Sequence, residues 1–233
     1  MTESSDLSSI ISEISKKYET SFDPLAVDGE ILQVLSIANM DRHIDRLIAA
    51  KSIHNPLLDL PLWAKIWPAS FVLGRFIRKY NPEGKTMLEL GCGMGICSLV
   101  ASRYGFSQIT ATDINRDALL FTRANILKNS LENLISAKYL DVSNPDQDIT
   151  RQPDFICASE LLYLDNLHRP LLKFIRRWLA PDGKAFFCTD LLRDKKHFEK
   201  LAAREFKVVS GCIGVKVEEN AKRIYKIIIL EKK

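Results

Sequence analysis

The sequence predicts an α/β fold, in which a seven-stranded, mostly parallel sheet is covered by helices on both faces. Two observations support this prediction. From Lys85 onward, apolar strand-like runs alternate with helical patterns, which is typical of a parallel sheet wrapped on both faces. A glycine-rich loop also joins the first strand-like run to a helix. The turn Pro181-Asp182-Gly183 precedes the fifth expected strand. The expected strands are 87–90, 108–112, 134–140, 155–159, 184–190, 207–210 and 224–230, the last with the alternation of a partly exposed antiparallel strand.

The glycine-rich loop reads Glu89-Leu90-Gly91-Cys92-Gly93-Met94-Gly95-Ile96. Its glycines let the backbone turn sharply and approach a ligand closely. A dinucleotide site requires G-x-G-x-x-G, and Ile96 stands where the third glycine of that pattern would be. Glu89 would repel a pyrophosphate but attract a cationic amino group, such as that of S-adenosylmethionine. The loop therefore favours S-adenosylmethionine, and a dehydrogenase is disfavoured.

This loop resembles motif I of the class I, seven-β-strand S-adenosylmethionine-dependent methyltransferases, and the resemblance implies a Rossmann-like fold. Asp113 closes the second expected strand, where the family places a carboxylate for both ribose hydroxyls. Asp141-Val142 follows the third, where the family's adenine pocket has an acid and an apolar neighbour. The cofactor-binding residues implied by the resemblance are Trp67, Glu89, Gly91, Cys92, Gly93, Gly95, Asp113, Ile114, Asp141, Val142 and Ser159.

The end of the fourth expected strand is where an acceptor must meet the methyl group, because ligands bind at the carboxyl ends of parallel strands. Glu160 and Tyr163 lie there, and they resemble the D/E-x-x-Y/F signature of the protein lysine methyltransferase branch, which is family 16-like. The resemblance implies that both are catalytic. Nucleic-acid amine methyltransferases carry two prolines at this place, where Leu161 and Leu162 stand here. An alternative is that Glu160 caps the following helix and Tyr163 packs.

Two tryptophans precede the glycine loop, in Leu62-Trp63-Ala64-Lys65-Ile66-Trp67-Pro68-Ala69-Ser70. Trp67-Pro68-Ala69, followed by a helix and then the glycine loop, resembles the entry segment of the lysine-methylating branch. In that branch the tryptophan lies against the cofactor. For Trp63 two interpretations stay open: it lines a pocket, or it anchors the N-terminal segment on the core.

Residues 1–59 are expected to form an N-terminal helical segment ahead of a methyltransferase domain over 60–233. Apolar side chains from Leu7 to Tyr18 recur at helical spacing, and further helical patterns lie around 27–38 and 42–51. Substrate selection in the family resides largely in such appendages, so the acceptor is the least defined part of the prediction.

Composition is that of a globular protein, with 46% hydrophobic and 27% charged residues among 233. No apolar run reaches the ~18 residues of a membrane span, and the N-terminus does not resemble a signal peptide, so we expect a cytoplasmic protein without a membrane partner. The five cysteines form no C-x-x-C pair, and no histidine has metal-ligand spacing, so no metal is expected.

The sequence therefore predicts an S-adenosylmethionine-dependent methyltransferase whose leading acceptor is a lysine of a protein. Small-molecule or nucleic-acid amines are the alternatives within enzymes. The net charge of +4 is too small to indicate nucleic acid by itself, and the basic residues around 169–177 fit a solvated helix face. A non-catalytic S-adenosylmethionine-binding partner subunit would be expected to lack Glu160 and Tyr163. The oligomeric state is not predicted.

Overall fold

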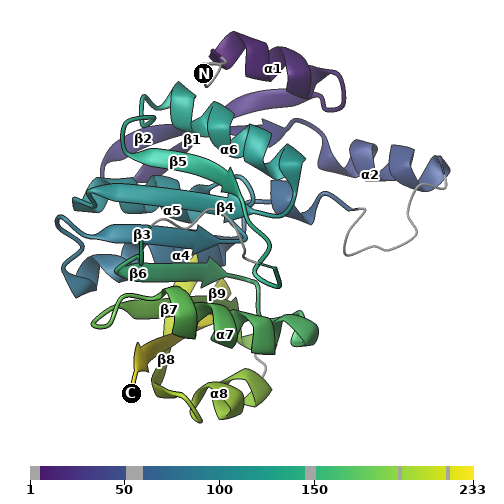
Figure 1. Cartoon of the computed structure of the whole chain (residues 1–233). Helices are drawn as coiled ribbons and strands as arrows, with labels where there is room; N and C mark the ends of the chain where they lie inside the picture. Colours follow the sequence, from purple (N-terminus) through teal and green to yellow (C-terminus); the bar gives the residue numbers. More distant parts are fainter. Residues whose placement is uncertain (1–5, 51–59, 145–150, 194–195, 219–220) are drawn as a thin grey trace.

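A seven-stranded sheet forms the centre of the computed structural model, which describes residues 6–50, 60–144, 151–193, 196–218 and 221–233 (Figure 1). Within these ranges the strand order is β5-β4-β3-β6-β7-β9-β8. The strands β3 to β7 run parallel, and β9 is antiparallel to both β7 and β8. Every predicted strand is confirmed, as β3 (Thr86–Leu90), β4 (Gln108–Asp113), β5 (Ile135–Tyr139), β6 (Phe155–Ser159), β7 (Lys184–Asp190), β8 (Phe206–Glu218) and β9 (Ala221–Lys232).

Helices cover both faces of this sheet. The central strands β3 and β6 are buried at every residue, as expected when helices pack on both sides. On one face the core is shared with α4 (Pro68–Phe76), α5 (Ile96–Ala101) and α6 (Arg116–Lys128), and on the other with α7 (His168–Trp178) and α8 (Lys196–Ala202). Short 3-10 helices are η1 (Leu62–Ala64), η2 (Ile77–Tyr80), η3 (Ser102–Tyr104), η4 (Asp165–Leu167) and η5 (Leu191–Arg193). Over the described ranges, no helix has the length and apolar character needed to cross a membrane.

The N-terminal segment contains a β-hairpin between two helices. Helices α1 (Leu7–Ser15) and α2 (Met40–Ala49) confirm two of the predicted helices, but the helix predicted over 27–38 is wrong. Instead, β1 (Thr20–Val27) pairs with β2 (Glu30–Ile37). Asp28 and Gly29 both have positive φ, 47° and 91°, as the two-residue turns of hairpins require. Residues 51–59 lie outside the described ranges, so the domain boundary after residue 59 stays a prediction.

Two side-chain amides, from α6 and its C-cap, bind this hairpin. The Asn129 side chain accepts a hydrogen bond from the backbone N–H of Gln33 and donates one to the backbone carbonyl of Gln33, both at 2.8 Å. Asn125 accepts from the N–H of Leu35 at 2.6 Å. The two amides therefore satisfy the free edge of β2 as a neighbouring strand would.

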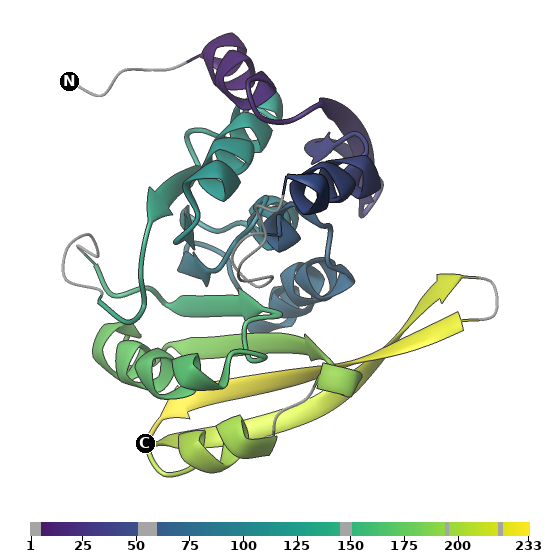
Figure 2. The same cartoon turned by 90° about the vertical axis from the view of Figure 1, so that its right-hand side faces the viewer.

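The hairpin of β8 and β9 extends past the end of β7 as a projecting arm (Figure 2). Its strand β9 pairs with β7 only as far as Tyr225, opposite Asp190, and beyond that point with β8 alone. The sequence predicts that the last strand, β9, is partly exposed. This is confirmed only in the arm, where Ile224 is 42% exposed, whereas β9 is buried from Ile227 to Leu230 because β8 forms the edge of the sheet.

Candidate active site

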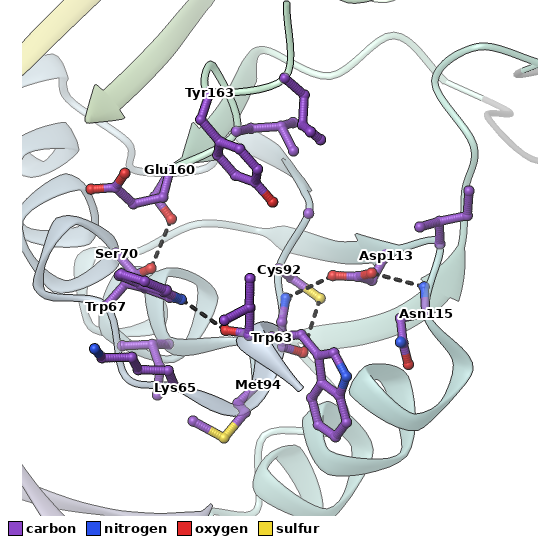
Figure 3. Close-up of a pocket in the computed structure, with 18 of the residues that line it drawn as sticks. Trp63, Lys65, Trp67, Ser70, Cys92, Met94, Asp113, Asn115, Glu160 and Tyr163 are labelled. Atoms are coloured by element: carbon purple, nitrogen blue, oxygen red, sulfur yellow. Dashed lines mark hydrogen bonds between the residues drawn. The ribbon is translucent and has the colours of Figure 1, made fainter. Parts of the chain in front are cut away.

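A cavity of about 510 Å³ opens at the carboxyl ends of the parallel strands (Figure 3). This is the place where open α/β sheets bind ligands, and the volume is in the range of cofactor sites. Of the predicted site residues, those that line the cavity are Trp67, Gly91, Cys92, Gly93, Asp113, Ile114, Asp141, Val142, Ser159, Glu160 and Tyr163. The structure adds Leu60, Leu62, Trp63, Lys65, Ser70, Met94, Ile96, Asn115, Leu140, Leu161, Leu164 and Leu167.

The glycine loop forms the floor of the cavity between β3 and α5. Gly91, Gly93 and Gly95 have φ of 65°, 55° and 80°, a region that side chains disfavour. At Gly93 a Cβ atom would lie 2.7 Å from the carbonyl oxygen of Trp63, so a side chain is also excluded by space. Gly95 is the N-cap of α5 and packs on Thr122, outside the cavity lining. The loop thus presents bare backbone to a ligand.

Asp113 ends β4 with its carboxylate at the cavity wall. One oxygen accepts from the N–H of Gly93 at 2.9 Å, and the other from the N–H of Asn115 at 2.8 Å. Burial raises the pKa of this carboxyl, and the backbone hydrogen bonds oppose the shift. Each oxygen keeps a further lone pair, so the carboxylate can accept hydrogen bonds from a diol while it fixes the glycine loop.

The neighbouring wall, at the end of β5, is more open. Ile114 follows Asp113 and is 58% exposed, and Leu140 and Val142 line the same side. Asp141 accepts from the N–H of Ser143 at 2.8 Å, which holds its carboxylate in a local turn. An apolar slot with one acid at its edge suits a flat ring that carries an amino group.

Glu89 lies beneath the glycine loop and does not line the cavity. Its carboxylate is 1% exposed and accepts from the backbone N–H of Ser98 at 2.9 Å, so it caps the first turn of α5. The other carboxylate oxygen has no partner among the described residues. Burial raises the pKa of Glu89 to about 7. Glu89 is not among the residues that line the cavity. Its contact with the cofactor's amino group stays a prediction.

Stability is expected to fall as the pH rises from 4.5 to about 7, because folded Glu89 keeps a proton that the unfolded chain releases. The shift corresponds to about 3 kcal/mol of unfolding free energy. Urea unfolding should give a lower unfolding free energy at pH 8 than at pH 5 in the parent protein. This slope with pH should be lost in Glu89→Gln. Glu205→Gln, at an exposed glutamate, is the control and should keep the slope. Equal slopes in the parent and Glu89→Gln would contradict the assignment.

Asn125 connects the N-terminal hairpin to the glycine loop. Its amide oxygen accepts from Leu35, and its amide nitrogen donates to the carbonyl of Met94 at 2.9 Å. The side chain is fully buried. Because Met94 lies between Gly93 and Gly95, one amide holds both the hairpin and the cofactor-facing loop.

Replacing Asn125 with alanine should weaken S-adenosylmethionine binding roughly tenfold, about the worth of one lost hydrogen bond to the loop. Asn129→Ala is the matched control, because Asn129 binds β2 but makes no hydrogen bond to the loop. Isothermal titration calorimetry of both folded variants compares the two affinities. An equal loss in both would mean that Asn125 acts only through general stability.

Glu160 follows β6 in an unusual backbone conformation. Its φ is 50°, which is rare for a residue other than glycine and is most often retained at functional sites. The carboxylate is 8% exposed and accepts from the N–H of Asp190 at 2.9 Å, with the hydroxyl of Thr189 at 3.5 Å. In Figure 3 this carboxylate points away from Asp113, so the two acids mark opposite ends of the site.

Aromatic side chains surround the space beside Glu160. Tyr163 points into the cavity from the segment after β6 (Figure 3). Trp67 donates its indole N–H to the carbonyl of Leu62 at 2.9 Å, and the Lys65 ammonium lies 4.8 Å from the centre of its ring. Ser70 and Ser159 share a buried 2.7 Å hydrogen bond that ties α4 to the end of β6. These contacts fix a partly apolar channel next to a carboxylate.

Trp63 satisfies both interpretations that its sequence left open. It lines the cavity, and its ring also packs edge-on against Phe121 at 5.0 Å and Tyr18 at 5.8 Å. The Tyr18 hydroxyl donates to Asp117 at the first turn of α6. Through these rings the N-terminal segment contacts the wall of the site.

The family model described as lysine methyltransferase matches residues 53–204, more than half of the chain. This chain belongs to the lysine methyltransferase family. The chain is 39% identical over 95 residues to the electron transfer flavoprotein beta subunit lysine methyltransferase homolog of Caenorhabditis elegans, and 38% identical over 60 residues to the ribosomal protein L11 methyltransferase of Thermotoga petrophila. These matches cover 38% and 26% of this chain, and 38% and 23% of the two relatives. The chain thus spans well under half the length of the curated relatives it matches.

The fold of the methyltransferase is also found among solved structures. The precorrin-6y C5,15-methyltransferase of Geobacter metallireducens superposes with a TM-score of 0.58 at 18% identity, over 70% of this chain and 87% of that one. The cavity fits S-adenosylmethionine: Gly91 and Gly93 line it without side chains, and Asp113 offers acceptors for a diol. The chain therefore belongs to a methyltransferase family and has a fold found in solved methyltransferases, which confirms the predicted fold.

Proposed function

We propose that this enzyme methylates the ε-amine of a lysine in a protein. The observation that carries the proposal is the pairing of Glu160 and Tyr163 on the cavity wall beside Trp67, at the far end from Asp113. An acid and aromatic rings suit a cationic chain end that enters through an apolar channel. The family description supports a lysine acceptor, and so does the flavoprotein-directed relative, although that match covers only part of either chain.

Transfer requires a neutral amine, because a protonated one has no lone pair. S-Adenosylmethionine supplies an electrophilic methyl group on a sulfonium centre. Deprotonating a lysine of pKa ~10.4 near neutral pH costs roughly 4–5 kcal/mol. Holding two reactants in line can contribute about 7–11 kcal/mol relative to reaction in water, so alignment outweighs that cost.

Each residue of the channel then has a defined task. The Glu160 carboxylate accepts a hydrogen bond from the incoming amine and orients it, and it receives the departing proton only secondarily. Tyr163 and Trp67 wall the channel and exclude water. Asp113 and the glycine loop hold the opposite end of the site, so binding of the donor and orientation of the acceptor are performed by different residues.

The test is incubation of the purified enzyme with methyl-labelled S-adenosylmethionine and a lysate of its source cells, divided between protease and nuclease. Protease-sensitive, nuclease-resistant label that maps to lysine by mass spectrometry is the expected result. Nuclease-sensitive label would reassign the acceptor to nucleic acid. Label found only in small molecules would overturn the protein acceptor.

A further inference from the structure

Three apolar residues that follow or face the end of β7 are exposed. Leu192 is 95% exposed, Ile224 42% and Leu191 39%. The antiparallel register of β7 and β9 pairs Asp190 with Tyr225. Leu191, which follows β7, and Ile224 of β9 are therefore the next residues beyond this pair, at the same end of the sheet. We call this set, Leu191, Leu192 and Ile224, the arm-base surface.

The projecting arm extends from the same edge of the sheet that opens the cavity. β7 ends at Asp190, whereas β9 continues through residues 221–224, which pair with β8 but not with β7. Four strand residues span about 13 Å at ~3.3 Å each. Figure 2 shows the arm standing clear of the remaining described elements. Among the described residues, no strand pairs with residues 221–224 on the side of β9 that faces β7 lower in the sheet.

The arm-base surface is joined to Glu160 through the end of β7. The N–H of Asp190 donates to the Glu160 carboxylate at 2.9 Å, and the next residue is Leu191. None of the three apolar residues lines the cavity. A small amine inside the cavity would therefore not reach them, whereas the surface of a protein whose lysine reaches Glu160 would contact them.

We propose that the arm-base surface docks the substrate protein, by holding an extended segment next to its target lysine; this inference rests on the proposed function. The segment lies along the free side of β9, where strand addition supplies backbone hydrogen bonds. Its apolar side chains cover Leu191, Leu192 and Ile224, whose exposure is otherwise unfavourable. The docking surface and Glu160 are fixed to one strand end, so docking places the lysine in register with the channel.

The experiment compares Leu192→Asp and Ile224→Asp with Val209→Asp. Val209 is 50% exposed on the same hairpin, but it pairs with Ile229 in the body of the sheet, away from the arm. Each variant receives methyl-labelled S-adenosylmethionine and source-cell lysate, and protease-sensitive label is counted. Calorimetry measures S-adenosylmethionine affinity, and thermal melting checks folding. Leu192→Ser is the second variant if an aspartate impairs folding, because a side chain with so little burial contributes little to stability.

Leu192→Asp and Ile224→Asp should lower protein labelling roughly tenfold or more, with S-adenosylmethionine affinity unchanged and Val209→Asp equal to the parent. Equal labelling by the arm-base variants and the parent would overturn the proposal, as would an equal loss in Val209→Asp. A parent dimer that Leu192→Asp dissociates on gel filtration would reassign the surface to self-association. If the parent itself labels no protein, the proposed function fails, which is a different outcome.

Discussion

Replacing Asp113 with alanine should weaken S-adenosylmethionine binding by roughly 100-fold or more, because a charged acceptor is worth about 1.5–3 kcal/mol per hydrogen bond and two hydroxyls lose it. The substitution also removes the partner of the Gly93 N–H, at 2.9 Å, and so loosens the glycine loop. Isothermal titration calorimetry with S-adenosylmethionine measures the loss directly.

Asp154→Ala is the control for Asp113→Ala. Asp154 likewise accepts two hydrogen bonds, from the N–H and hydroxyl of Thr86, but Thr86 begins β3 at the amino edge of the sheet. Its removal should lower the unfolding free energy and leave the affinity unchanged. If both variants lost affinity to the same extent, Asp113 would act through stability and its assignment to the ribose would fail.

Replacing Glu160 with glutamine should reduce kcat by roughly 100-fold or more and leave S-adenosylmethionine affinity near that of the parent. Glutamine keeps an oxygen to accept from the N–H of Asp190, so the backbone conformation with φ of 50° is retained. The amide lacks the negative charge that orients a cationic amine. Single-turnover methylation of lysate protein, with calorimetry in parallel, separates transfer from donor binding.

Glu199→Gln provides the matched change at a distance. Glu199 lies on α8 and pairs with Lys226 of β9, outside the cavity lining, so its substitution should leave kcat within about twofold of the parent. A fall in donor affinity in Glu160→Gln as large as that in Asp113→Ala would place Glu160 on the cofactor side.

The sheet and most of the site could be predicted because their determinants are local. Each strand from β3 to β7 is a short apolar run bounded by turn residues, and each parallel strand brings its carboxyl end to one edge. Gly93, Asp113 and Glu160 all lie just after such runs, so their convergence on one cavity followed from order alone. The same argument applies to Asp141, whereas Ser159 was implied by the family resemblance.

The rest depends on contacts between distant segments. Asn125 has nothing in its neighbourhood that distinguishes it from a solvated helix residue, yet it binds Leu35 and Met94. The spacing of Glu89 from Gly91 predicts a contact with the cofactor, which stays a prediction; its capping of α5 depends on the distant Ser98 N–H and is not visible in the sequence. Asp28-Gly29 between apolar runs is a hairpin signal. The apolar spacing over 27–38 also fits a helix, so the sequence predicts a helix where the structure has a hairpin.

The shared use of Asn125 also sets limits on how this enzyme can be engineered. A chimera that replaces the first fifty residues with another protein's N-terminal segment would leave the Asn125 amide oxygen without the Leu35 N–H. The same amide holds Met94, so the graft would disturb the donor-binding loop as well. The N-terminal segment of this chain therefore cannot be exchanged as a unit unless the facing side of α6 is exchanged together with residues 30–37.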